Sequence, residues 1–542
     1  MKLNIKIVSF FSIISLLLFA CAQQVAPTGG PKDFTPPKVL KSSPKNGTLN
    51  YQNEAIEIRF DEYVKLKQLK KELLVSPPLK HNLRTQLKGR SLIINIQDTL
   101  KENTTYVLNF GKSIVDITED NPINNFQYVF ATGDTIDSLS ISGRVVDAYS
   151  LKVKEDVLVL LHEKHDSDST ISKKRPNYIS RTDKNGLFTV QNVKKGKYQL
   201  YALKDRNDNF LFDKGEKIAF YTDVVNVNDS KLNDSLKLYL FEVTKKTQYL
   251  DERKERGPNY SLQFKFPLED FHFKILDTTE NVLLHHEISE DKKLVSFWFN
   301  EMPKERLQIH INDDTLYSDT LKFRVDSLKR NSPLVLAKNL LSMQAYYKPY
   351  EIEFNRPISK FNESSIQLLA ADSSEIEFKL KQDSIHAAKF YLDVPLNQDS
   401  SYILTLFKGA FTDIYGRKND SLSQSFNVDN SSNYSQLSVR IQADTDAPMI
   451  LELITSDEKV LRSFPVDNKV IDIKHLKAAS YRLRLIFDEN NNGEWDSGDY
   501  YKNKSPEKVW IYNEEITLRQ NWDREITWVI NQAKAIDESI EQ

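Results

Sequence analysis

The residues of this sequence that are best suited to chemistry are oxygen-bearing side chains spaced two apart. The segment after Phe487 has Asp or Asn at five ligand positions of a calcium loop, and these residues are Asp488, Asn490, Asn492, Asp496 and Asp499. Gly493 occupies the position at which such a loop turns sharply, and Glu494 follows it, where a backbone carbonyl is the usual ligand. Because Ca²⁺ prefers carboxylate, amide and carbonyl oxygens, the segment predicts a calcium site.

A second segment repeats this spacing earlier in the chain. It consists of Asp205, Asn207, Asn209, Asp213 and Glu216, with Leu211 as the carbonyl donor. Each segment follows an apolar run that begins at Tyr198 or Tyr481, and the tyrosines and loops share one offset, which indicates a duplicated module. Phe210 stands where a calcium loop prefers glycine, and a bulky residue with positive φ is costly, so this copy departs from the calcium pattern.

Two interpretations of these loops stay open at this point. Calcium would brace each module rather than act as a signal, because neither segment is flanked by amphipathic helices that an ion could move. Alternatively, each segment is an Asx-rich hairpin whose side chains accept hydrogen bonds from nearby backbone amides.

Short strands broken by turns must position these loops. Ala55 to Phe60 and Tyr260 to Phe266 alternate apolar with polar residues, whereas Ser91 to Ile96 is more fully apolar. A chain of 542 residues is too long for one hydrophobic core. We therefore predict an all-β fold made of tandem β-sandwich modules.

The N-terminus has the composition of an export signal. Lys2 and Lys6 precede an apolar run that ends at Leu18, and Ala20 stands directly before Cys21. Leu18 to Cys21 resembles the lipobox of bacterial lipoproteins, and this resemblance implies cleavage and acylation at Cys21. Cys21 is the only cysteine of the sequence, so the exported modules are expected to fold without disulfides. No other apolar run approaches the roughly 20 residues of a membrane-spanning helix, which leaves the lipid as the expected anchor.

Two kinds of module resemble known families. Asn103 to Tyr106 with Ile114 to Asp116 resembles the SbsA-type Ig-like domain, first named from S-layer proteins, and Asp399 to Tyr402 with Asp413 repeats the pattern. The strands between Ile141 and Leu200 resemble the carboxypeptidase-regulatory-like (prealbumin-like) β-sandwich, an accessory domain that implies no chemistry. Val25 to Asp33 resembles the tether of Bacteroidetes lipoproteins that carry the Ig-like domain.

These observations predict the following organisation: a signal peptide (1–20), a Pro/Gly-rich tether (21–37), an Ig-like domain (38–135), a regulatory-like sandwich (137–245), a β-rich module of uncertain type (246–330), a second Ig-like domain (331–430), a diverged second regulatory-like sandwich (434–532) and a polar tail (533–542).

Composition and motifs argue against several functions. A net charge of -2 with 28% charged residues gives a surface of mixed sign, which excludes nucleic acid as the expected partner. The sequence has no G-x-S-x-G, P-loop or dinucleotide motif. His162 and His165 are three residues apart, whereas a zinc protease helix needs a separation of four. We therefore expect a protein that is not an enzyme.

The expected function is that of a lipid-anchored protein that binds or scaffolds other components of the cell envelope at the outer membrane. Residues 22–24 carry no acidic charge, which favours the periplasmic face over the cell surface. The expected partners are the membrane, through the lipid, and envelope proteins or glycans. One alternative is a surface glycan-binding lipoprotein that uses Trp510, Trp522 and Trp528, and another is an envelope hydrolase with an unrecognised site in residues 246–330.

Overall fold

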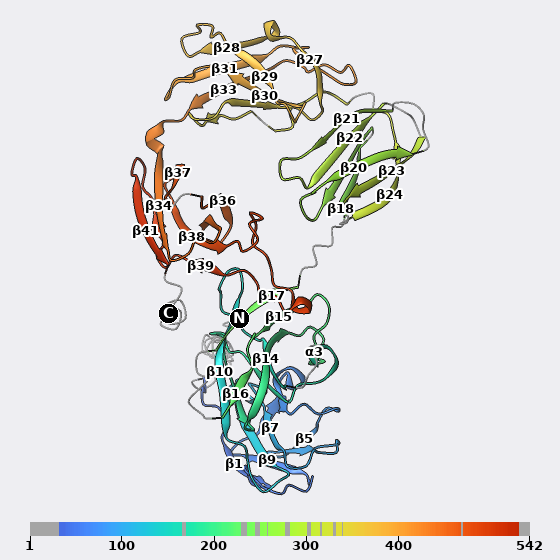
Figure 1. Cartoon of the computed structure of the whole chain (residues 1–542), viewed down its shortest axis with the longest axis vertical. Helices are drawn as coiled ribbons and strands as arrows, with labels where there is room; N and C mark the ends of the chain where they lie inside the picture. The colour runs from blue at the N-terminus through green and yellow to red at the C-terminus, as the bar shows by residue number, and fades with distance from the viewer. Residues whose placement is uncertain are drawn as a thin grey trace, which may run out of the picture. The chain divides into compact units, whose positions relative to one another are not determined.

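The computed structural model describes residues 32–164, 170–228, 236–243, 250–256, 258–276, 282–300, 305–314, 317–328, 332–338, 340–467 and 470–530. The predicted signal peptide, Cys21, most of the tether and the polar tail lie outside these residues. The chain divides into two compact units (Figure 1). The first runs up to Val145 and adds Val153–Asp213 and Ala219–Leu238; the second contains Val146–Lys152, Lys214–Ile218 and the residues from Tyr239 onward.

The prediction of an all-β fold of β-sandwich modules is confirmed. Within the described ranges, α-helix is confined to two single turns, α2 (Leu69–Glu72) and α3 (Thr170–Lys173), and strands form nearly all other regular structure. Neither turn of helix is long or apolar enough to cross a membrane.

The first module is a sandwich that owes its core to alternating residues. Along β2 (Ile56–Phe60), Ile56, Ile58 and Phe60 are buried and the two residues between them are exposed, as a half-buried strand requires. One sheet has the order β1-β2-β6-β5, a second has β4-β7-β9, and β3 pairs with β8. The remaining strands are β1 (Val39–Ser43), β3 (Val64–Leu66), β4 (Leu74–Ser76), β5 (Arg84–Lys88), β6 (Ser91–Asn95), β7 (Thr105–Asn109), β8 (Ile114–Asp116) and β9 (Gln127–Ala131).

The second module is one sheet path of the order β12-β11-β14-β15-β17-β10-β13, with β16 pairing beside β14. Its central strands are apolar on both faces, and Leu158 to Leu161 are all buried. Its strands are β10 (Leu139–Asp147), β11 (Leu158–Glu163), β12 (Tyr178–Arg181), β13 (Leu187–Val193), β14 (Gly196–Lys204), β15 (Lys217–Phe220), β16 (Val225–Val227) and β17 (Leu236–Glu242).

The third module packs a sheet of the order β18-β19-β22-β21 against a sheet of the order β20-β23-β24. Its core is aromatic, and Tyr260 stacks on Phe323 with 4.1 Å between ring centroids. The strand β18 (Leu250–Arg256) lies at an edge, and its residues 251–254 are exposed and charged. The other strands are β19 (Asn259–Phe264), β20 (Phe271–Leu276), β21 (Leu283–Ile288), β22 (Leu294–Phe299), β23 (Glu305–Asp313) and β24 (Tyr317–Val325).

The fourth module repeats the architecture of the first. A sheet of the order β25-β33-β31-β28 faces one of the order β26-β30-β29, and β27 pairs with β32 as β3 pairs with β8. Its strands are β25 (Met343–Gln344), β26 (Tyr350–Glu353), β27 (Ile358–Phe361), β28 (Ile366–Ala370), β29 (Lys379–Gln382), β30 (Lys389–Asp393), β31 (Ser401–Leu406), β32 (Phe411–Asp413) and β33 (Leu422–Val428).

The last module repeats neighbour relations of the second. Its sheets have the orders β37-β34-β41 and β36-β35-β38-β39, and β40 also pairs with β38. Here β36-β35-β38 corresponds to β12-β11-β14, and β34-β37 corresponds to β10-β13. Its strands are β34 (Tyr434–Ala443), β35 (Met449–Thr455), β36 (Val460–Pro465), β37 (Val470–Lys477), β38 (Ser480–Phe487), β39 (Val509–Ile511), β40 (Ile516–Thr517) and β41 (Arg524–Ile530).

Candidate functional site

The Asp488 loop leaves the end of β38 and gathers four of its predicted ligands. The carboxylate of Asp488 accepts hydrogen bonds from the amides of Asn492 (3.0 Å) and Gly493 (2.8 Å). The side-chain amides of Asn490 (2.6 Å) and Asn492 (3.2 Å) both donate to Asp496 Oδ2. The backbone amide of Glu494 donates to Asn492 Oδ1. These contacts give the loop a fixed shape built from its own polar groups.

The last predicted ligand of this loop, Asp499, caps a helix instead. Asp499 precedes a short 3-10 helix (η3, Tyr500–Lys502), and its side chain accepts the amide of Tyr501 at 2.9 Å. Side chains at the N-cap commonly satisfy such an amide, so this carboxylate is committed to capping.

Sequence reasoning missed Glu507, a buried carboxylate beside the loop. Its Oε1 accepts the amide of Glu489 (2.9 Å) and its Oε2 accepts the amide of Asp496 (2.8 Å). Burial raises the pKa of Glu507, and the nearby charges of Asp496 and Asp488 add to this, although the two backbone hydrogen bonds lower it. Glu507 lies after the last ligand position of the calcium pattern, so the sequence carries no signal for this contact.

The Asp205 loop shares most of this internal arrangement. Asp205 accepts the amides of Asn207 (3.0 Å) and Phe210 (2.8 Å), while Asn207 and Asn209 each donate a side-chain amide to Asp213 Oδ2 at 2.8 Å. Phe210 has φ +62°, in the left-handed region that the sequence predicted to be costly. The remaining predicted ligands are Leu211, whose amide donates to Asn209 Oδ1, and Glu216, which is buried.

Both loops therefore have the hydrogen bonds of an Asx-rich hairpin. Within the described ranges, no group of three or more His, Cys, Asp or Glu side chains is arranged to hold a metal ion. Calcium binding requires the asparagine side chains to turn their oxygens toward the ion, and it stays a prediction for both loops.

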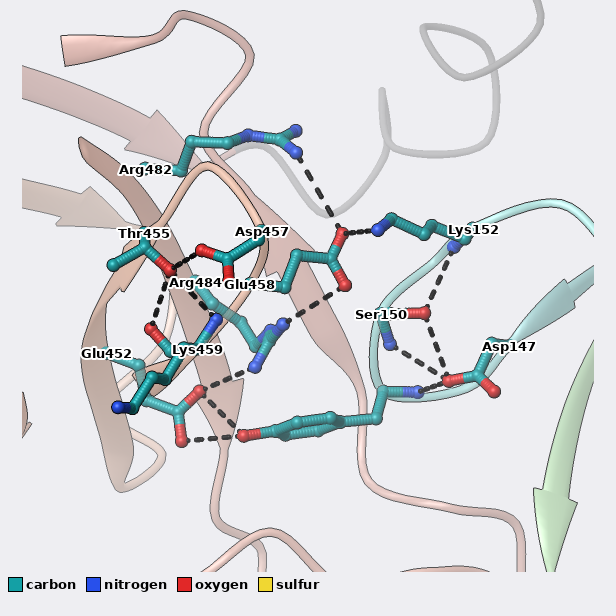
Figure 2. Close-up of polar contacts among 11 residues, drawn as sticks. Asp147, Ser150, Lys152, Glu452, Thr455, Asp457, Glu458, Lys459, Arg482 and Arg484 are labelled. Atoms are coloured by element: carbon teal, nitrogen blue, oxygen red, sulfur yellow. Dashed lines mark hydrogen bonds and ion pairs between the residues drawn. The ribbon is translucent and has the colours of Figure 1, made fainter. Parts of the chain in front are cut away.

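A buried charged cluster lies on β35 and β38 of the last module (Figure 2). Arg484 is 1% exposed, and its Nη1 lies 3.0 Å from Oε2 of Glu452, which is also buried. Tyr149, from the segment Val146–Lys152 of the same compact unit, donates its hydroxyl to both oxygens of Glu452 at 2.8 Å. Its ring lies 3.9 Å from the Arg484 guanidinium, a cation–π contact. Removing such charges from water is expensive, so the pairing must compensate for the burial.

Neighbouring groups complete the cluster. Burial raises the pKa of Tyr149 to about 12, so its hydroxyl keeps the proton that it donates. Glu458 lies 3.0 Å from Lys152 Nζ, 3.9 Å from Arg482 and 4.0 Å from Arg484. Figure 2 shows Lys152 and Glu458 directed toward each other across the gap between the two segments.

The tight turn that presents Tyr149 is formed by one aspartate. Asp147 Oδ1 accepts the amides of Tyr149 (3.3 Å) and Ser150 (3.1 Å), and also the Ser150 hydroxyl (Figure 2). The segment is thus shaped locally by Asp147 and held to the sheet by Tyr149 and Lys152.

The other residues singled out in the sequence are mostly structural. Trp528 is a buried core residue and Trp510 packs against the same core, so the prediction that they form a sugar-stacking surface with Trp522 is wrong. Trp522 is 50% exposed and lies beside Arg519. Aromatic residues on strands usually belong to the core, as here.

His162 is buried in the second module, where burial lowers its pKa to about 4, and His165 lies outside the described residues.

A polar pocket lies between residues of the third and fourth modules. Its volume is about 270 Å³, and its lining includes Trp298, Asn259, Arg356 and Tyr415. The Tyr415 hydroxyl donates to the carbonyl of Phe299 at 3.0 Å. The pocket therefore combines aromatic rings with polar side chains, of which Arg356 is already paired with Asp413 and Ser332.

Comparison with known proteins identifies one domain. Residues 33–132 match the family model of the bacterial Ig-like domain. This part of the chain is Ig-like. The match agrees with the expectation for residues 38–135. No curated protein matches the chain.

Solved structures that resemble the chain are distant. The major pilin subunit BcpA of Bacillus cereus is 10% identical, with 72% of this chain and 99% of that chain covered and a TM-score of 0.14. The S-layer protein rSbsC(31-844) is 9% identical, with 90% and 68% covered and a TM-score of 0.15. The Bacteroides ovatus mixed-linkage glucan utilization locus protein SGBP-B, solved with a mixed-linkage heptasaccharide, is 10% identical, with 63% and 88% covered and a TM-score of 0.18. At these identities and TM-scores, the similarities carry no argument about function.

Proposed function

We propose that the protein is a lipid-anchored, non-enzymatic module of the outer membrane that binds or scaffolds other envelope components. The observation that supports this best is that buried charged residues of the protein pair with one another or bond to the backbone. Arg484 with Glu452, and Arg356 with Asp413, form ion pairs inside β-sandwich modules. Asp313, in the module where a hydrolase site was considered, is fully buried and accepts the amides of Glu269 and Asp270 at 2.9 Å. These ion pairs and backbone hydrogen bonds hold strands and turns of the fold.

The anchor is tested by metabolic labelling with an alkyne fatty acid. We expect label on the wild-type protein and none on Cys21→Ser, because the lipobox pattern places the acylated thiol at this position. Label retained in Cys21→Ser would refute the proposed anchor.

The periplasmic face is tested by protease shaving of intact cells. The protein should stay uncut until the outer membrane is opened, because residues 22–24 lack the acidic charge of the surface-export pattern. Complete digestion on intact cells would place it on the cell surface.

Partners are sought by co-purification from solubilised outer membranes, with the Cys21→Ser protein as the control for contacts that need the anchor.

A second candidate function is glycan binding, which the pocket beside Trp298 favours. Trp298 and Tyr415 bring aromatic rings to this pocket, and the polar side chains of Asn259 and Ser296 line it beside them. Binding to a glycan array that is lost in Trp298→Ala and kept in Trp522→Ala would support this site. Binding that survives Trp298→Ala would exclude it.

A further inference from the structure

The outer face of the sheet β36-β35-β38-β39 is buried although the sheet belongs to a two-layer sandwich. Leu451, Leu453, Leu483 and Leu485 point into the module's own core, where their exposure is 0%. Strand residues alternate between faces, so the residues between them point outward. These outward residues are nevertheless buried, and they are Ile450, Glu452, Ile454, Arg484 and Ile486. Something other than the module's own core must cover them.

Part of the cover comes from earlier in the chain, and part comes from Trp495 of the last module's own Asp488 loop. Tyr149 and Leu151 pack with Trp495 against Ile450 and Ile486. The rings of Tyr149 and Trp495 are 4.9 Å apart. The apolar contacts lie beside the charged contact, in which Tyr149 meets Glu452 and Arg484. Both contacts need the turn 147–152 in place.

A second contact joins the last module to the end of β17. The Ser497 hydroxyl donates to the carbonyl of Glu242 at 2.5 Å. A Cβ added at Gly498 would lie 2.6 Å from Cζ of Phe241 and 2.9 Å from the carbonyl oxygen of Lys504. Gly498 is thus required by close packing, because any larger residue would collide with Phe241. All of these residues belong to the second compact unit.

We propose that the outer face of the sheet β36-β35-β38-β39 is an intramolecular docking surface whose partner is the turn 147–152 of this chain, so that the chain between Glu242 and Met449 starts and ends at one contact. A linear series of modules has no reason to place a buried arginine, its carboxylate and three apolar residues on an outward face. The partner is specified by chemistry: a tyrosine hydroxyl for Glu452, an aromatic face for Arg484 and a lysine for Glu458.

The test is modification of arginine by phenylglyoxal in the full-length protein, read by mass spectrometry at Arg484 and Arg440. Arg440 lies in the same module on β34, and its side chain is 46% exposed, so it reports the rate of an accessible guanidinium. In the wild type we expect Arg440 to react and Arg484 to be protected. Tyr149→Ala removes the part of the cover that comes from the turn 147–152. Gly498→Leu forces Phe241 away at the second contact, with a further clash against the Lys504 carbonyl of its own module, and keeps every residue of the charged cluster. Both variants should lose the protection of Arg484.

Tyr63→Ala is the matched control, because Tyr63 is 55% exposed and lies in the first module. It should leave the protection unchanged. Circular dichroism of each variant checks that the modules remain folded. Reaction of Arg484 at the rate of Arg440 in the wild type would overturn the proposal. So would continued protection in both folded variants, because the cover would then come from the last module itself.

Discussion

The first and fourth modules share one strand arrangement and keep an aspartate at the same point, but they place opposite charges beside it. In the first, Asp116 ends β8 and accepts the amides of Glu119 (2.7 Å), Asp120 (2.9 Å) and Asn121 (3.2 Å). In the fourth module, Asp413 ends β32 and accepts the amides of Tyr415 (2.9 Å) and Arg417 (2.7 Å). The role of the aspartate in shaping the following turn is thus the same.

The partner of this aspartate differs between the copies. Arg356 lies two residues after Phe354 and its Nε lies 2.6 Å from Asp413 Oδ2. Glu62 holds the matching place after Phe60, and its pKa is raised by burial and by the charges of Asp61 and Asp116. The fourth module therefore neutralises its buried aspartate with an ion pair, whereas the first satisfies it with backbone amides and tolerates a second carboxylate. A repeated fold can keep a turn and exchange the charge beside it.

The largest expected effect comes from removing the arginine. Arg356→Ala should destabilise the fourth module by roughly 3–5 kcal/mol, because it leaves a buried carboxylate without its partner. Hydrogen exchange of the amides in β27 and β32 measures this locally. Lys338→Ala, which breaks an ion pair whose lysine is 70% exposed, is the control and should cost less than about 1 kcal/mol. Equal effects of the two variants would contradict the role given to Arg356.

The two Asx-rich loops differ less than the two aspartate turns, since they share most of their internal contacts. If they bind calcium, millimolar Ca²⁺ should stabilise the last module by on the order of 1 kcal/mol, because extracellular sites bind at about 10⁻⁴ to 10⁻³ M. Calorimetry of the full-length protein should show a transition that falls by a few degrees with chelator. Asp488→Ala should abolish this response, and Asp205→Ala should change it less, because Phe210 replaces the turn glycine. A melting curve indifferent to calcium and chelator in the wild type would identify both loops as hairpins.

Placing an arginine at position 62, as in the fourth module, tests whether Glu62 destabilises the first module. Glu62→Arg should stabilise that module by roughly 0.5–1 kcal/mol, the range of a partly exposed pair, because it replaces repulsion from Asp116 with attraction. Glu57→Arg, at an exposed position of β2, is the control. Denaturant unfolding measures both, and a Glu62→Arg protein no more stable than this control would show that the two carboxylates do not interact.

The smallest effect is a pH dependence confined to the first module. The raised pKa of Glu62 means that the folded state binds this proton more tightly than the unfolded state. Its contribution to stability is present below the ordinary glutamate pKa and is lost as the pH rises through the folded pKa. Unfolding measured across this range should show the stability of Glu62→Gln gaining on the wild type as the pH rises. A constant difference between the two would contradict the raised pKa.

The strands could be predicted from the sequence because their signal is local. Alternation along residues 55–60 leads directly to the buried Ile56, Ile58 and Phe60. The repeated spacing after Tyr198 and Tyr481 likewise located two loops that share the asparagine contacts to Asp213 and Asp496.

The contacts between distant segments could not be predicted. Tyr149, Glu452 and Arg484 are unremarkable at their own positions, and their pairing depends on how two parts of the chain meet. Glu507 supports the Asp488 loop from outside its spacing. The alternative of a sugar-binding surface at Trp528 stayed open because composition reports an aromatic residue and not the face of the strand on which it lies.

The edge strand β18 has a consequence for the protein in concentrated solution. Its sequence, Leu-Asp-Glu-Arg-Lys-Glu-Arg, places six charged residues in succession on a strand at the end of the order β18-β19-β22-β21, and no further strand pairs with it among the described residues. Unpaired edges template the addition of further strands from other molecules, and charged side chains on an edge oppose this. Replacing these charges with Thr or Val would convert the third module into a site of self-association. The dense charge of β18 is therefore best understood as protection of a multi-sandwich chain against aggregation.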